Sequence, residues 1–78
     1  SRCGAQRPSD GRWLARPCKQ RRPFVCRRAD DSVVLVPARV RGDSPPPGCG
    51  AIRTGRENEQ ARAAAGGRIP WVFSAPRR

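Results

Sequence analysis

Four cysteines in a chain of 78 residues constrain the fold more than any other feature of this sequence. They are Cys3, Cys18, Cys26 and Cys49, and the chain contains neither a histidine nor a CxxC pair. Structural zinc sites use four nitrogen or sulfur ligands, usually in close pairs, and a thiol nucleophile needs a basic partner such as histidine. The cysteines are therefore expected to form disulfides, as in proteins of oxidising compartments, and three connectivities are open.

The inventory of large apolar side chains is small. The chain has two Trp, two Phe, no Tyr and no Met, against nine Pro and eight Gly. A chain of this length buries a modest fraction of its surface, and a composition rich in Pro and Gly favours turns and disorder. We therefore expect a small ordered part and a large disordered one.

Residues 1–28 have the pattern of compact β-structure. Turn formers at residues 8–11 precede a short strand expected around Trp13, and a second strand is expected over residues 22–27. Two short strands are not stable alone in water, and the sequence offers no evident core for Trp13 and the apolar residues of the second strand. This mismatch predicts that a partner segment is missing and that the chain is a fragment.

Residues 29–78 are expected to form a mostly disordered tail rich in Pro, Arg, Gly and Ala. The run from Val33 to Val36 is β-prone, but Pro37 ends it, and we interpret it as an unstructured sticky patch rather than an edge strand. Residues 69–73 contain two aromatic side chains with no evident partner.

One short helix is expected in this tail, over residues 56–65. Thr54 and Glu57 form a candidate capping box, and Gly66 stops the alanine-rich run. Isolated helices of this length are marginal, and a helix whose apolar side chains are all alanines has little with which to dock.

The cysteines of residues 1–28, together with Trp13 and the segment Pro23-Phe24-Val25-Cys26, resemble the closing segment of the C-type lectin-like domain. Trp13 precedes Cys18 by five positions and Cys18 precedes Cys26 by eight, which are usual spacings in that family. The resemblance implies an α+β, C-type lectin-like fold of which only the last β-strands are present, as a small disulfide-linked hairpin region. It also implies an extracellular carbohydrate-binding module, secreted or part of the ectodomain of a membrane protein.

The resemblance further implies that Cys3 pairs with Cys18 and that Cys26 pairs with an upstream cysteine that the chain lacks. Cys26 is then left unpaired here, or it meets Cys49 in a non-native bridge. Sugar-binding members of the family use calcium, held in part by Asn and Asp directly after the Trp. Here those positions are Leu14 and Ala15, whose side chains carry no oxygen ligand. We therefore expect no metal site and no cofactor in this chain, with calcium confined to an upstream part of the domain.

The charge of the chain indicates a second candidate function. The net charge is +11, and residues 1–28 hold nine bases and one acid. Arginine suits sulfate, phosphate and carboxylate partners, so we consider calcium-independent binding of heparin, sulfated glycans or anionic membranes. The same charge also fits a solvated basic surface that keeps the chain soluble. The candidate polyanion-binding residues are Arg16, Lys19, Arg21, Arg22, Arg27 and Arg28.

A third candidate function is integrin adhesion through Arg41-Gly42-Asp43. An exposed turn would present a cation and a carboxylate at opposite ends, and Gly42 permits such a turn. A three-residue motif also arises by chance in a chain rich in Arg and Gly.

Other functional classes are not expected. An enzyme would need a base for a nucleophile or paired acids, and the sequence shows neither arrangement. The charge would suit nucleic acid, but no nucleic-acid-binding motif accompanies it. No apolar run reaches the length of a signal peptide or a membrane span.

Overall fold

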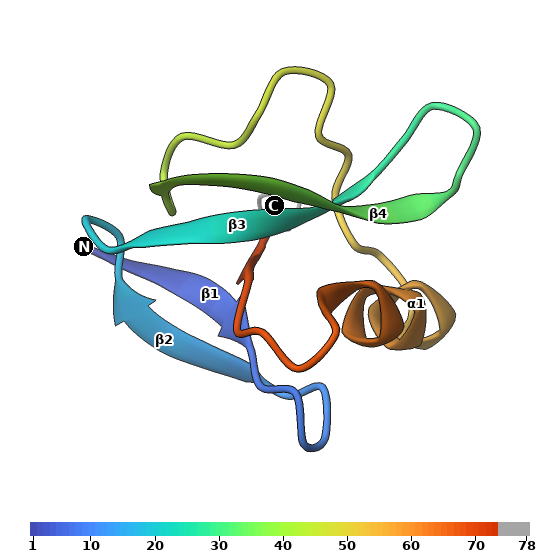
Figure 1. Ribbon diagram of the computed structural model, residues 1–78, viewed down its shortest axis with the longest axis horizontal. Helices are drawn as coiled ribbons and strands as arrows, with labels where there is room; N and C mark the ends of the chain where they lie inside the picture. The colour runs from blue at the N-terminus through green and yellow to red at the C-terminus, as the bar shows by residue number, and fades with distance from the viewer. Residues whose placement is uncertain (74–78) are drawn as a thin grey trace.

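Five strands and one helix make up the computed structural model, which describes residues 1–73 (Figure 1). The strands form one sheet in the order β2-β1-β5-β3-β4. β1 is antiparallel to β2 and to β5, β3 is antiparallel to β4, and β5 runs parallel to β3. The elements are β1 (Arg2–Gln6), β2 (Trp13–Pro17), β3 (Arg21–Arg27), β4 (Val33–Arg41), α1 (Gly55–Ala65) and β5 (Trp71–Val72).

The two-residue strand β5 joins the two hairpins into one sheet. Trp71 pairs with Ala5 of β1 on one side and with Phe24 of β3 on the other. Its side chain is fully buried at 0% exposure, and its indole Nε1 donates to the backbone oxygen of Val40 at 2.9 Å. The expectation that residues 69–73 have no partner is therefore wrong. A two-residue strand has no local pattern, because its pairing depends on strands far away in the sequence.

The segment expected to be mostly disordered contains two strands, β4 and β5, besides the expected helix. The β-prone run from Val33 onward belongs to β4, which pairs with β3. The register shifts between Arg22 and Phe24, opposite the part of β4 that contains Pro37. A proline is tolerated there because β4 is an edge strand and the irregularity removes the need for its missing N–H.

The helix α1 begins one residue before the expected range and ends at the expected residue. The backbone N–H of Glu57 donates to the hydroxyl oxygen of Thr54 at 3.1 Å, and Gly66 closes the helix in a left-handed conformation with φ of 58°. The Glu57 carboxylate accepts from the N–H of Arg53 rather than from that of Thr54, so the reciprocal half of the capping box is displaced by one residue.

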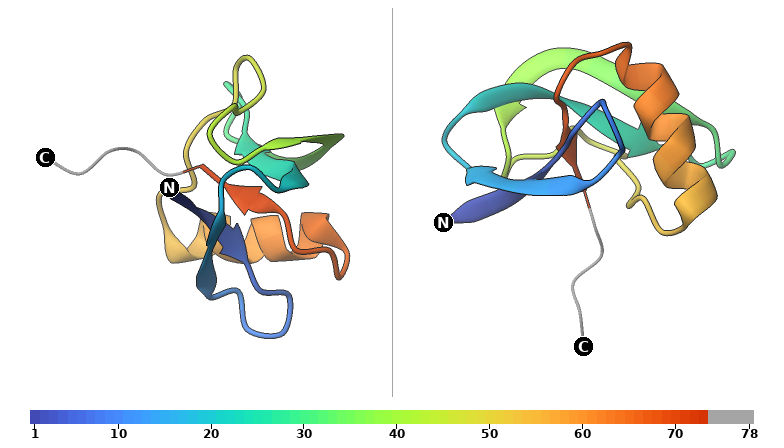
Figure 2. Two further views of the ribbon diagram at one scale, coloured as in Figure 1. Left: turned by 90° about the vertical axis from the view of Figure 1, so that its left-hand side faces the viewer. Right: turned by 90° about the horizontal axis from the view of Figure 1, so that it is seen from below.

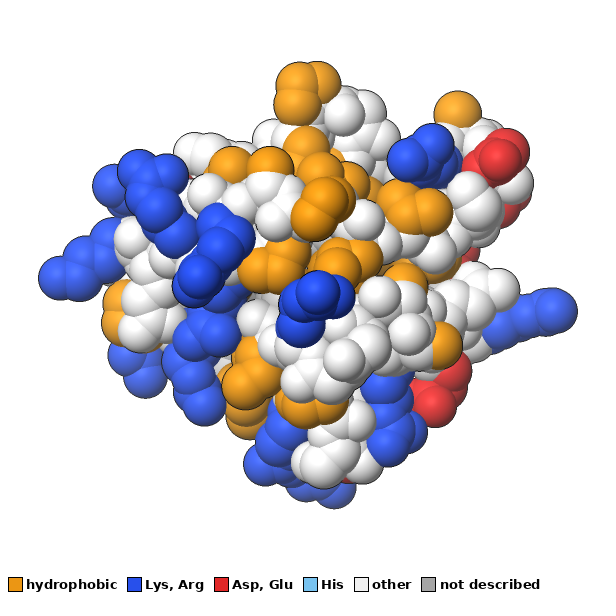
Figure 3. Space-filling model, viewed as in Figure 1, with side chains coloured by type: hydrophobic (Ala, Val, Ile, Leu, Met, Phe, Trp, Pro, Cys, Tyr) orange, Lys and Arg blue, Asp and Glu red, His pale blue; other side chains and the backbone are white. Residues whose placement is uncertain are grey.

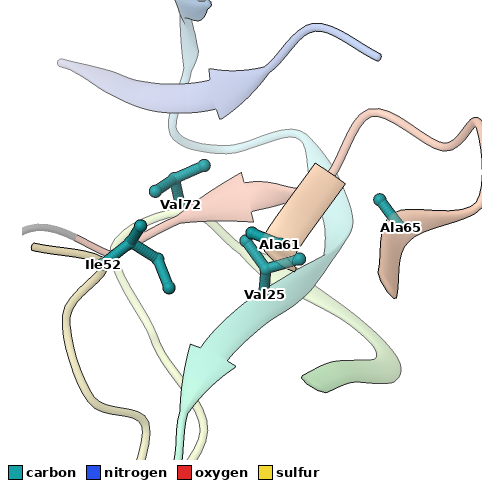
Figure 4. Packing of buried hydrophobic residues seen from close by; sticks show 5 residues of the cluster. All are labelled: Val25, Ile52, Ala61, Ala65 and Val72. Atoms are coloured by element: carbon teal, nitrogen blue, oxygen red, sulfur yellow. The ribbon is translucent and has the colours of Figure 1, made fainter. Parts of the chain in front are cut away.

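The helix docks through its alanines, contrary to expectation. Ala61 and Ala65 are fully buried and pack with Val25, Ile52 and Val72 (Figure 4). Small side chains let the helix lie close to the sheet, so that larger residues on the strands fill the space between them. Phe24 and Val25 thus obtain their core from other parts of the same chain, in β1, β4, α1 and β5.

Trp13 was expected to need a hydrophobic core, but the structure leaves it on the surface. It lies in β2 with 43% of its surface exposed, outside both clusters of buried residues. Its indole Nε1 donates to Oδ1 of Asn58 at 2.8 Å, and the Asn58 amide donates to the backbone oxygen of Gly11 at 2.9 Å. Asn58 therefore ties α1 to the β1–β2 hairpin by polar contacts.

Two disulfides connect the four cysteines. The Cys3–Cys18 bridge implied by the resemblance is present, with the Cα atoms 5.1 Å apart. The prediction that Cys26 lacks its partner is wrong, because Cys26 is bonded to Cys49 with the Cα atoms 4.8 Å apart. The backbones of Arg27 and Gly50 exchange hydrogen bonds of 3.0 and 2.8 Å, which hold Cys49 against the end of β3.

Candidate polyanion-binding site

Every carboxylate side chain of the protein lies in the described residues, and five of the six are in ion pairs. The sixth, Asp30, accepts hydrogen bonds from Ser32. The arginines in these ion pairs are Arg7, Arg12, Arg27, Arg41, Arg53 and Arg62. The acidic side chains are thus all engaged locally, and the other basic residues within 1–73 form no ion pair with them.

Most of these other cations gather at one end of the sheet, which we call the basic end. Arg2 and Arg16 lie beside the paired ends of β1 and β2, and Arg21 lies opposite Arg41. The backbone N–H of Gly42 donates to the Cys18 oxygen at 2.8 Å, which brings the two hairpins together at this end. Within residues 1–73, no carboxylate forms an ion pair with the residues of the basic end, which are Arg2, Arg16, Lys19, Arg21, Arg22 and Arg39.

The views of the molecule agree with this separation. The N-terminus and the β2–β3 connection lie at the opposite side from α1 (Figures 1 and 2). Basic side chains crowd that side of the surface, and the acidic side chains visible in the same view lie on the other side (Figure 3). The basic end is therefore a part of the surface rich in basic side chains.

The lowered pKa of Arg22 reflects its burial and the positive charges around it. Burial lowers the pKa of its guanidinium, and the positive charges of Arg16 and Arg39 lower it further. The guanidinium is held by NH1 donating to the Ile69 oxygen at 3.2 Å and by NH2 donating to the side chain of Gln20 at 2.8 Å. Like charges held close together attract an anion more strongly than a single cation does.

The six candidate residues from the sequence fall into two groups. The structure brings Arg16, Lys19, Arg21 and Arg22 together at the basic end. Arg27 and Arg28 lie at the far end of β3, about 20 Å away along the strand.

The guanidinium of Arg27 already has partners within the protein. Its Nε donates to the Ala51 oxygen at 3.0 Å, and it forms ion pairs with Asp31 and Glu57. Together with Arg53, these charged residues form the paired end of the molecule. Because the acids neutralise it, Arg27 does not extend the cationic surface that the sequence assigned to it.

Sequence reasoning missed Arg39 and Arg68. Arg39 reaches the basic end on β4 and donates to the Arg21 backbone oxygen at 3.2 Å. Arg68, in the α1–β5 connection, lines a hollow together with Arg22 and Arg39. Their charge was the only available signal, because both lie in the segment that was expected to be disordered.

At the paired end, Glu57 is the central acid. Its side chain is 11% exposed, and its carboxylate accepts from Arg53, with the closest guanidinium contact at 2.8 Å. Hydrogen bonds from the Arg53 side chain and backbone lower the pKa of Glu57 from 4.5 to about 2. The charges at this end therefore contribute to holding α1 in place.

The integrin candidate has its two charged groups joined to each other. Nε and NH2 of Arg41 donate to the two carboxylate oxygens of Asp43 at 3.0 and 3.1 Å. A Cβ on Gly42 would lie 2.8 Å from the Cβ of Cys3 and 2.9 Å from the Trp71 ring, so the turn is packed onto the protein. This geometry differs from an open loop that presents Arg and Asp at opposite ends.

Leu14 and Ala15, which the lectin resemblance would align with calcium ligands, lie on β2, where Leu14 is half-buried and Ala15 is exposed. Across residues 1–73, no three His, Cys, Asp or Glu side chains are grouped so that they could hold a metal ion.

The chain matches no protein-family model, no curated protein and no solved structure. In the described part of the chain, no helix has the length and apolar character needed to cross a membrane.

Proposed function

We propose that the protein binds sulfated or otherwise polyanionic glycans through its basic end, without a metal ion. The observation that carries this proposal is the separation of charge. The acids are engaged with other arginines or with Ser32, whereas the basic end has no carboxylate partner within residues 1–73.

Arginine forks form charge-assisted, often bidentate hydrogen bonds to oxyanions, and a polyanion engages several of them at once. The binding partner then releases its condensed counterions, so the affinity is expected to fall steeply with salt. Backbone pairing of the strands and the Cys3–Cys18 disulfide hold the basic end in shape, which reduces the ordering cost of binding.

The resemblance to the C-type lectin-like domain supports a glycan as the ligand and remains part of this proposal. It rests on residues 1–28 and on the Cys3–Cys18 bridge, while the Cys26–Cys49 bridge departs from the family's pattern. Two disulfides are typical of proteins in oxidising compartments, and on that ground we propose an extracellular location.

The proposal is tested by heparin affinity of the full oxidised chain, measured by calorimetry at several salt concentrations with and without a chelator. Lys19→Gln/Arg21→Gln removes two exposed cations of the basic end. The matched control, Arg28→Gln/Arg56→Gln, removes the same charge from exposed positions outside it. We expect about a tenfold loss for the first variant, less than about twofold for the control, and no effect of chelator.

Two outcomes would overturn the proposal. Equal losses in both variants would mean that net charge, and not the basic end, attracts heparin. Loss of glycan binding on adding a chelator would instead support the calcium-dependent lectin.

A further inference from the structure

One side of the basic end contains a hollow of about 460 Å³. Three arginines from separate elements surround it: Arg22 of β3, Arg39 of β4 and Arg68 of the α1–β5 connection. The remainder of its lining is apolar and consists of Pro23, Leu35, Pro37 and Ile69. The hollow therefore combines a concentrated positive charge with a hydrocarbon wall.

The three guanidinium groups have donors to spare. Arg39 is exposed and makes a single hydrogen bond, to the Arg21 oxygen, and Arg68 makes no side-chain hydrogen bond or ion pair within residues 1–73. Each guanidinium carries five N–H donors, so each can still offer bonds to an oxyanion.

Arg22 is the fixed member of the three. Its guanidinium carbon lies 5.4 Å from the centre of the Trp71 ring, and its NH1 and NH2 are each anchored by one hydrogen bond. Its Nε is buried and has no hydrogen-bond partner in the described residues. A partly buried cation flanked by other cations is unfavourable, and a bound anion beside it would offset part of that cost.

The apolar wall is unusual for a site that binds only a polar polysaccharide. Ile69 is 38% exposed, and Leu35 and Pro37 also line the hollow. Exposed apolar surface beside a few convergent charged groups is typical of a pocket for a small organic ligand. A sulfated sugar fills such a wall poorly because it carries hydroxyl groups around its ring.

We propose that this hollow is a subsite for an aryl sulfate, in which the sulfate meets Arg22, Arg39 and Arg68 and the aromatic ring lies on Leu35, Pro37 and Ile69. The inference rests on the proposed function, because it names the ligand class of one part of the same cationic surface. An aryl sulfate occurs as a free small molecule and as sulfated tyrosine in a peptide, and both present the same chemistry.

The first test compares phenyl sulfate, inorganic sulfate and phenol as ligands of the full oxidised chain. Binding is followed by NMR through the arginine Nε–Hε signals. We expect phenyl sulfate to bind at least about fivefold more tightly than inorganic sulfate, because only phenyl sulfate uses the apolar wall. Phenol should not bind measurably. Equal binding of phenyl sulfate and inorganic sulfate would overturn the subsite.

Substitutions then locate the site. Arg39→Gln and Arg68→Gln should each weaken phenyl sulfate about tenfold, and both residues are exposed, so the fold should tolerate the changes. Ile69→Ser should weaken phenyl sulfate while leaving inorganic sulfate unchanged. A parallel loss for both ligands in Ile69→Ser would contradict the role of the wall.

The variant Lys19→Gln/Arg21→Gln separates this inference from the proposed function. It should lower heparin affinity and leave phenyl sulfate within about twofold, because neither residue lines the hollow. In the unchanged protein, absence of heparin binding together with phenyl sulfate binding would overturn the proposed function alone, and heparin binding without phenyl sulfate binding would overturn the subsite alone. A short peptide with one sulfated tyrosine, compared with free phenyl sulfate, distinguishes the two sources of the ligand.

Discussion

At the start of β3, Arg21 and Arg22 lie among other cations, whereas at the end of the same strand Arg27 lies between Asp31 and Glu57. Each end is held by its own disulfide, Cys3–Cys18 near the basic end and Cys26–Cys49 beside the paired end. The two ends have the same kind of basic side chain and opposite electrostatic surroundings.

The difference between the ends shows that the neighbours of an arginine decide its role. At the paired end, acids from the β3–β4 turn and from α1 bind Arg27 and Arg53, so their charge contributes to stability. At the basic end, no described carboxylate forms an ion pair with the basic residues, and the nearby Asp43 is held by Arg41, so the charge of the basic end remains available to a ligand. The comparison predicts that changes at the two ends affect different properties.

Removal of the Cys26–Cys49 bridge should have the largest effect on stability. The bridge spans 23 residues of sequence, and loss of a disulfide of this size lowers the free energy of unfolding by about 3 kcal/mol. The double variant Cys26→Ala/Cys49→Ala is measured by urea unfolding. Its heparin affinity at a temperature where it is folded should match that of the unchanged protein, and a joint fall would show that the two ends are coupled.

The next largest effect is expected from salt on the heparin complex. Each cation that contacts the polyanion adds about one to the slope of log affinity against log salt concentration. Lys19→Gln/Arg21→Gln should therefore reduce the slope by about two, whereas Arg28→Gln/Arg56→Gln should leave it unchanged. Equal slopes for both variants would show that the basic end contributes no more to heparin binding than the rest of the surface does.

Lowering the pH should reduce the stability that the ion pairs of the paired end contribute. The folded protein holds the pKa of Glu57 at about 2 instead of 4.5, so the charged carboxylate is favoured in the folded state. Its contribution is complete above about pH 4.5 and is lost as the pH falls towards 2. Melting temperatures between pH 6 and pH 2.5 should fall for the unchanged protein and fall less steeply for Glu57→Gln. Parallel curves would contradict this role of Glu57.

The smallest effect on stability and on heparin affinity is expected from changes to the exposed ion pair Arg41–Asp43. Asp43→Asn should shift the melting temperature by no more than about 2 °C, because exposed ion pairs contribute little. Arg41 would then join the neighbouring basic end, and heparin affinity should rise by less than about threefold. A large fall in melting temperature would show that the pair supports the turn around Gly42.

Local signals predicted the local elements well. Thr54, the alanines and Gly66 mark a helix, and the structure has one from Gly55 to Ala65. The strand expected over residues 22–27 corresponds to β3. Caps, turn residues and short strands depend on neighbours in sequence, so their signals are present in the chain itself.

Long-range pairings escaped prediction. Trp71 lies 47 positions after Phe24 and pairs with it through a two-residue strand, and the Cys26–Cys49 bond lies beside a backbone bridge between Gly50 and Arg27. The same limit affected the candidate site. Arg39 and Arg68 join Arg22 only after β4 and the α1–β5 connection have folded onto β3.

The sequence by itself determined the excess of arginine over acid, the four cysteines, and the positions of the helix caps and turns. Only the tertiary structure decided which cysteines are joined, which arginines meet a carboxylate, and which are left facing one another. The physical reason is that charge and covalent potential belong to single residues, whereas electrostatic surroundings depend on distances. In this protein, β5 and α1 set those distances by bringing the second half of the chain onto the first.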